Sequence, residues 1–197
     1  MNSHLAIFDF DGTITKYDSF IYFIQFYKGR FFFFLGFFFL FPVLVLYRLG
    51  IIKNSRAKEI VLAYFFKNDS LTLFQEKCDY FGTHIIPGII KQEAHNKIQN
   101  HLEQGHRVIV ITASAENWLS LWCRNIGIEL IATRLENKNG LLTGKISGKN
   151  CYGEEKVSRL KEYLNLNDYS EIYAYGDSKG DNPMLELAQH KYYKTFK

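Results

Sequence analysis

Two aspartates that follow a short apolar run near the N-terminus constrain this chain more than any other feature. Leu5-Ala6-Ile7-Phe8 has the composition of a short buried strand, and Asp9-Phe10-Asp11-Gly12-Thr13 follows it directly. Carboxylates this close repel each other unless a cation lies between them, so the pair indicates a cation site at the end of a strand. Gly12 permits a sharp turn, and Thr13 can cap the segment that follows. The alternative is an acidic turn with no ligand, because Asp-Gly turns are common.

The rest of the sequence predicts an α/β fold. We expect strands at 107–112, 129–135, 141–146, 171–175 and 191–195, and helices at 91–104, 116–125, 154–164 and 183–189. Asn139-Gly140 indicates a hairpin turn between the second and third of these strands. The alternation predicts a Rossmann-like, mostly parallel sheet with helices on both faces. Ligands bind such sheets at the carboxyl ends of the strands, where Asp9, Thr112 and Asp177 fall.

Four segments resemble, in the same order, the motifs of the haloacid dehalogenase (HAD) superfamily of phosphatases. They are Asp9-Phe10-Asp11-Gly12-Thr13-Ile14-Thr15, Val108-Ile109-Val110-Ile111-Thr112, Gly153-Glu154-Glu155-Lys156 and Gly176-Asp177-Ser178-Lys179-Gly180-Asp181. The resemblance covers nearly the whole chain and points to subfamily IB. It implies a catalytic core formed by residues 1–16 and 85–197. Residues 17–84, which match loosely, would form an inserted helical cap of the C1 type, joined to the core by hinge strands at 15–19 and 84–88.

The resemblance implies a role for each acid of these motifs. Asp9 is expected to attack phosphorus and form an aspartyl-phosphate, while Asp11 serves first as acid and then as base. Mg²⁺ is the expected cofactor. Its ligands are expected to be the Asp9 and Asp177 carboxylates and the main-chain carbonyl of Asp11, with Asp181 acting through a water. The alternative for Asp177 and Asp181 is a polar turn that caps a helix beginning near Pro183.

The resemblance also implies a binding site for the transferred phosphate. Lys156 is expected to neutralise its charge, although a lysine on an exposed helix is the simpler interpretation of that residue alone. The Thr112 hydroxyl, the Ala113 amide and the main-chain amides of the loop from Phe10 to Gly12 are expected to bond its oxygens. Ser114 is a weaker alternative to Thr112.

Charge and cysteine content narrow the class further. The net charge is +4 without a tight cluster of Lys and Arg, so we expect no nucleic-acid partner. The three cysteines are scattered, which is typical of a reducing compartment such as the cytoplasm, and no Cys or His spacing indicates zinc. The N-terminus leads directly into the expected strand, so we expect no cleavable signal peptide. The sequence indicates no oligomeric state.

Residues 31–47 form an uncharged segment in which eight of seventeen positions are Phe. Three interpretations stay open: the core of the cap, a membrane-interface helix or re-entrant hairpin bent at Pro42, or a short membrane span interrupted by Gly36 and Pro42. Basic residues flank the segment on both sides: Lys28, Arg30, Arg48 and Lys53. They favour an anionic membrane surface as partner, with both ends of the segment on the cytoplasmic side.

The substrate class follows only from the resemblance, and it implies a phosphomonoester. The chain is most similar to the C-type phosphatidylglycerophosphate phosphatase group, which implies a lipid head-group phosphate. The alternative is a soluble enzyme similar to phosphoserine phosphatases, in which a cap acid reads the amino group. Asp18 and Glu59 are the nearest candidates for that acid, and neither fits well. A catalytically silent module that binds a phosphorylated ligand is the alternative of another class.

Overall fold

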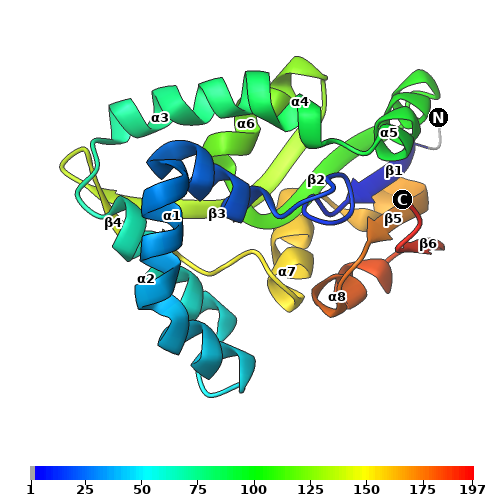
Figure 1. Ribbon diagram of the computed structural model, residues 1–197. Coiled ribbons are helices and arrows are strands. Elements are labelled where there is room, and N and C mark those ends of the chain that lie inside the picture. Colours follow the sequence, from blue (N-terminus) through cyan, green and yellow to red (C-terminus); the bar gives the residue numbers. More distant parts are fainter. Residues whose placement is uncertain (1–2) are drawn as a thin grey trace.

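The computed structural model describes residues 3–197, and a six-stranded sheet lies at its centre (Figure 1). The strands are β1 Ser3–Phe8, β2 Arg107–Ala115, β3 Glu129–Lys138, β4 Leu141–Ser147, β5 Tyr169–Gly176 and β6 His190–Tyr193. Their order is β4-β3-β2-β1-β5-β6, and only the β3–β4 pair is antiparallel. Asn139 and Gly140 both have positive φ in the β3–β4 turn. The mostly parallel sheet and the predicted hairpin are therefore confirmed.

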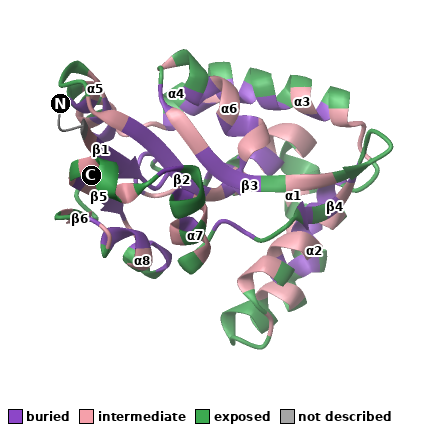
Figure 2. Cartoon of the chain, turned by 180° about the vertical axis from the view of Figure 1, so that it is seen from behind, coloured by how far each residue is buried: buried purple, intermediate pink, exposed green. Residues whose placement is uncertain are grey.

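The central strands are largely buried (Figure 2). Their alternate residues belong to two separate cores, one on each face of the sheet. Ala6 and Phe8 of β1 pack with α5 and α6, whereas Leu5 and Ile7 pack with α7 and α8. These helices are α5 Gln92–Glu103, α6 Glu116–Asn125, α7 Glu154–Tyr163 and α8 Asn182–Leu185. The expected helices on both faces are thus present. The last helix is shorter than predicted, and β2 continues three residues beyond Thr112.

The chain between β1 and α5 forms a group of helices beside the sheet. They are α1 Ser19–Arg48, α2 Asn54–Phe66, α3 Leu71–Tyr80, a π-helical turn Phe81–Ile85 and α4 Ile86–Ile89. α1 and α2 lie side by side (Figure 1). They are so close at Gly36 that a Cβ there would be 2.4 Å from the ring of Phe65. Gly36 therefore does not interrupt the helix as the sequence suggested. It permits the close approach of α2.

α2 is fastened to β4 at the edge of the sheet. A Cβ at Gly144 would lie 2.3 Å from Cα of Ala63, so the strand and the helix touch through their main chains. The segment after α2 then pairs with the strand: the Asn68 amide donates to Leu142 O at 2.8 Å, and the Leu142 amide donates to Asp69 O at 3.0 Å. The inserted helices and the β3–β4 hairpin are consequently one packed unit.

The re-entrant hairpin bent at Pro42, one of the open interpretations, is wrong. α1 continues through Pro42, and its break is at Gly29, whose φ of 78° and ψ of 161° are not helical. Only glycine adopts this conformation at little cost, whereas Pro42 removes a single main-chain donor and the flanking turns stay packed on α2. The chain reverses later, in residues 49–53 between α1 and α2.

One face of the aromatic segment is packed and the other is open. Phe33, Gly36, Phe37, Leu40, Val43 and Leu44 form a buried or half-buried stripe at helical spacing. The outer face is apolar as well, and Phe31 and Phe38 are each 73% exposed. The interpretation as cap core therefore accounts for the inner face alone. α1 is long and apolar enough to cross a membrane, and 11% of its most apolar window is buried.

The two connections between the sheet and the inserted helices differ from the expected pair of hinge strands. Thr15 pairs with Ile90 in a single antiparallel bridge, flanked by a hydrogen bond of 2.8 Å from the Lys91 amide to Ile14 O. Residues 84–88, predicted as the second strand, are helical. Pro87 lies in the first turn of α4, where its missing N–H has no intrahelical partner to lose.

Candidate active site

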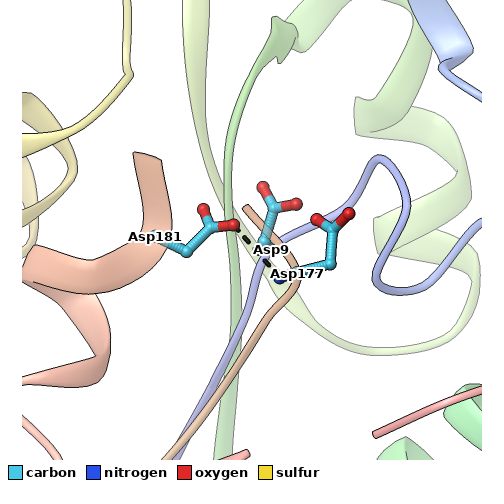
Figure 3. Close-up of side chains that lie close together, drawn as sticks. All are labelled: Asp9, Asp177 and Asp181. Carbon is cyan, nitrogen blue, oxygen red and sulfur yellow. Dashed lines mark hydrogen bonds between the residues drawn. The ribbon is translucent and has the colours of Figure 1, made fainter. Parts of the chain in front are cut away.

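Three aspartates from the carboxyl ends of β1 and β5 face one another (Figure 3). Asp9 follows β1, Asp177 follows β5, and Asp181 ends the short 3-10 turn Lys179–Asp181. One carboxylate oxygen of each lies within 4.8 Å of the other two. In the described part of the chain, this is the one group of three Asp, Glu, His or Cys side chains close enough to share a metal ion.

Lys156 lies between two of these acids and comes from the first turn of α7. Its Nζ donates to Asp9 Oδ1 at 2.5 Å and to Asp181 Oδ1 at 2.6 Å, and its side chain is 2% exposed. Lys156 is thus not the surface lysine of the simpler interpretation. Burial would lower its pKa, but the two carboxylates outweigh burial and raise it.

The charges of this cluster are not balanced by Lys156 alone. Burial raises the pKa of Asp9 to about 7 against the lowering effect of Lys156, with further increases from Asp181 and Asp11. Burial and Asp181 also raise the pKa of Asp177. Asp181 differs, since Lys156 and hydrogen bonds from Ser178 overcome burial and lower its pKa. Three hard oxygen donors with excess negative charge fit Mg²⁺, and the cluster contains no soft sulfur or nitrogen ligand.

The carboxylate of Asp11 is not part of this cluster and is held by two serines. It accepts hydrogen bonds from the Ser19 amide at 2.6 Å and from Ser114 Oγ at 2.5 Å. Burial raises the pKa of Asp11 to about 6, Asp18 adds to the increase, and the two serines oppose it through their hydrogen bonds. The two acids of the N-terminal motif thus have different surroundings. The expected metal contact of Asp11 through its main-chain carbonyl stays a prediction.

The residues expected to bind phosphate line the same cavity as the acids or adjoin it, and their polar groups make hydrogen bonds within the protein. The Thr112 hydroxyl is buried near the end of β2 and accepts the Ser114 amide at 3.0 Å, while Ser114 Oγ is committed to Asp11. Gly12 has φ +78°, and a Cβ there would lie 2.4 Å from Asp177 Oδ2. Its amide donates to Thr15 Oγ1 at 3.3 Å. The Phe10 ring is in the core, so only its main chain could serve a ligand.

A cavity of about 360 Å³ joins these residues to the inserted helices. Its lining includes the acid cluster, Thr112 and Ala113, and an apolar wall made by α1 and α2. Asp18 lines it too, and its side chain caps α1 by accepting the Ile21 amide at 3.0 Å. Glu59 does not line this cavity, and accepts the Ile146 amide of β4 at 3.2 Å instead.

The sequence did not single out Lys58, which enters the cavity from α2. Its Nζ donates to Ala113 O and lies 3.5 Å from Asn150 Oδ1. Burial lowers its pKa to about 8 against the opposing effect of Asp11 and Asp18. No local pattern marks Lys58 among its charged neighbours, because its role depends on how α2 packs on the core. Tyr152, whose ring covers Gly180 at the rim, was missed for the same reason.

Comparison of the sequence with known proteins assigns this chain to a family. The family model described as haloacid dehalogenase-like hydrolase matches residues 6–186. The chain is 31% identical to Protein CicA of Caulobacter vibrioides over 195 residues, which is 98% of this chain and 86% of that protein. A histidinol-phosphatase of Neisseria meningitidis is 32% identical over 116 residues, which is 55% of this chain and 52% of the relative.

Solved structures agree with this assignment at the level of the fold. A Bordetella pertussis protein of unknown function superposes with a TM-score of 0.80 and 26% identity, covering 95% of this chain and 88% of that one. A substrate-bound phosphoserine phosphatase superposes with a TM-score of 0.67 and 19% identity, covering 98% and 86%. The matched family model spans most of the chain and every acid of the cluster. The chain therefore belongs to the haloacid dehalogenase-like hydrolases.

Proposed function

We propose that this chain is a Mg²⁺-dependent phosphomonoester hydrolase that works through an aspartyl-phosphate on Asp9. The observation that carries the proposal is the separation of two neighbouring acids. Asp9 lies in the cluster with Asp177, Asp181 and Lys156, and Asp11 is held apart by serine hydrogen bonds. Two carboxyl groups in different surroundings can take different roles, one as nucleophile and the other as proton donor.

In the first step a carboxylate oxygen of Asp9 attacks phosphorus while the bond from phosphorus to the ester oxygen breaks. Asp11 gives its proton to that oxygen, so the alcohol leaves neutral. In the second step Asp11 takes a proton from a water that attacks phosphorus, and the bond from phosphorus to Asp9 breaks. Free phosphate leaves, and Asp9 and Asp11 return to their starting states.

The other residues of the cluster would stabilise charge on the phosphoryl group. Lys156, the Thr112 hydroxyl and the amides of Ala113 and of residues 10–12 are the proposed partners of its oxygens. Asp9, Asp177 and the main-chain carbonyl of Asp11, with Asp181 acting through a water, would hold Mg²⁺, which would supply further positive charge. The choice of Mg²⁺ is supported by three carboxylates whose negative charge Lys156 does not balance, since their oxygens are hard donors.

For the substrate we propose a lipid head-group phosphate such as that of phosphatidylglycerophosphate. Two observations support it: the apolar wall of the cavity and the exposed apolar face of α1. A helix that is apolar all round is either buried or in contact with lipid, and the outer face of α1 is not buried. The flanking Arg30, Arg48 and Lys53 complement anionic lipid at the cytoplasmic face of the inner membrane, whereas Lys28 is paired with Asp69 at 3.1 Å.

The second candidate is a soluble enzyme that acts on a small phosphorylated metabolite. Relatives named histidinol-phosphatase and phosphoserine phosphatase favour it, although each matches only about half of this chain. In both candidates we propose that residues 17–84 act as the cap and that residues 1–16 and 85–197 act as the catalytic core.

The reaction is tested with p-nitrophenyl phosphate at neutral pH with and without Mg²⁺. We expect magnesium-dependent release of phosphate, which Asp9→Asn and Asp11→Asn each abolish. Lys138→Gln, on the exposed end of β3, is the matched control and should keep full activity. A wild-type protein that binds phosphate but releases no nitrophenol would instead support the silent binding module.

The membrane partner is tested by sedimentation with vesicles of phosphatidylglycerol or of phosphatidylcholine. We expect binding to the anionic vesicles and release at high salt. Phe31 and Phe38 are each 73% exposed, so removing both rings from a lipid surface costs roughly 2–4 kcal/mol, or about 30- to 1,000-fold in affinity. If the Phe31→Ser, Phe38→Ser double variant binds as tightly as the wild type, this helix is not the membrane contact.

A further inference from the structure

The cavity that holds the acids has both a polar and an apolar lining. Its polar lining consists of carboxylates, the Thr112 hydroxyl, Lys58 and Lys156, together with Tyr47 and Asn54 of the α1–α2 pair. Its apolar wall includes Phe20, Phe37 and Leu44 of α1 and Val61 of α2. Ligand sites usually combine an apolar lining with a few polar groups that fix orientation.

The apolar wall is too long for a small leaving group such as serine or glycerol. Phe37 and Leu44 are seven residues apart on the same stripe of α1, which corresponds to about 10 Å along the helix. Val61 faces them from α2 and is 5% exposed. A small polar alcohol would leave this wall uncovered or would place its own hydroxyl groups against it without hydrogen-bond partners.

We propose that the leaving group of the substrate carries an alkyl chain, and that Phe37, Leu44 and Val61 form the subsite that binds this chain between α1 and α2. The inference rests on the proposed function, because it places the phosphate at Asp9. It adds that the side chains between α1 and α2 recognise the alkyl chain of the substrate, in addition to the contacts of the acid cluster with its phosphate. The outer face of α1, which includes Phe38, does not line the cavity, so it would not contact the alkyl chain of the substrate.

The test is a series of n-alkyl phosphates from ethyl to octyl, each below its micelle concentration and without vesicles. Each methylene that enters an apolar site raises kcat/KM by about two- to fourfold. Octyl phosphate has six more methylenes than ethyl phosphate, so we expect its kcat/KM to be at least about 60-fold higher, mainly through a lower KM. A flat series with measurable turnover of every ester would overturn the subsite and leave the phosphatase proposal intact. No turnover of any ester, p-nitrophenyl phosphate included, would overturn both.

Two variants locate the subsite. Leu44→Ser replaces part of the wall with a hydroxyl and should reduce the octyl-to-ethyl ratio several-fold; this ratio is internal to one protein sample. Leu73→Ser on α3, where Leu73 is 61% exposed and lines no part of this cavity, is the matched control, and its ratio should equal that of the wild type. An unchanged ratio in folded Leu44→Ser, or a reduced ratio in Leu73→Ser, contradicts the placement. If Leu44→Ser does not fold, Val61→Thr, which keeps the side-chain shape, makes the same measurement.

Discussion

Acid should weaken this fold through one buried imidazole. The side chain of His101, near the end of α5, is 2% exposed. Its Nε2 lies 2.9 Å from the Tyr175 hydroxyl, and its Nδ1 lies 2.8 Å from Nδ1 of His106. Burial, joined by smaller effects of His106 and Lys97 in the same direction, lowers the pKa of His101 to about 4. A proton on this ring is therefore much less favourable in the folded chain than in the unfolded one.

The sign of the effect follows from which state binds the proton. The unfolded imidazole titrates near pH 6.5 and the folded one near pH 4, so the unfolded chain binds more protons between these values. The stability that the neutral ring contributes is complete above pH 6.5 and is lost as the pH falls toward 4. Between about pH 7 and pH 5 this single group should lower the free energy of unfolding by about 2 kcal/mol.

Urea unfolding at pH 7 and pH 5 measures this effect by comparing the wild type with His101→Gln. The titrations of the acid cluster are common to both proteins and cancel in the difference. We expect the wild type to lose about 2 kcal/mol more than the variant between the two pH values. His84→Gln, at an exposed position, is the matched control for the loss of an imidazole. If His101→Gln has the same pH dependence as the wild type, the burial argument for His101 is refuted.

Three further predictions concern the site and its support. Gly12→Ala should lower kcat/KM by about 100-fold, because its Cβ would lie 2.4 Å from Asp177 Oδ2 at a φ of +78°, and steady-state kinetics at saturating Mg²⁺ measure this. Gly144→Ala should lower the free energy of unfolding by about 2–4 kcal/mol in urea, since φ is +77° and the Cβ meets the main chain of Ala63. Removal of divalent ions with EDTA should abolish turnover of p-nitrophenyl phosphate and leave the protein folded by circular dichroism, with activity restored by Mg²⁺. An active Gly12→Ala, an unaffected Gly144→Ala or full turnover in EDTA would contradict the corresponding argument.

The sheet and the acids could be predicted because their signals are local. The central strands contain apolar runs, and their parallel order brings the carboxyl ends of β1, β2 and β5 to one edge. Asp9, Thr112 and Asp177 could therefore be placed near one another from their positions in the sequence. The fold class followed from the same pattern, since strands that alternate with helices leave few other topologies.

The inserted helices were harder because their contacts are distant in the sequence. Gly36 has the local signature of a helix break, yet the missing side chain serves the approach of Phe65. Gly29, with no distinguishing neighbours, is the actual break in α1. The same holds for the contact of Lys58 with Ala113 and for the hydrogen bonds of Ser19 and Ser114 to Asp11. These contacts depend on how α1 and α2 pack on the core, which no spacing along the sequence reveals.

The strand-like pairing of Asn68 with Leu142 limits how a substrate can reach Asp9. A lid joined to its core by two linkers alone could swing open as a rigid flap. In this protein, such a movement would have to break the main-chain hydrogen bonds to β4 or move the whole β3–β4 hairpin as well. Admission of substrate should thus rely on rotation of rim side chains such as Tyr152, and the amides of Asn68 and Leu142 should resist deuterium exchange throughout turnover.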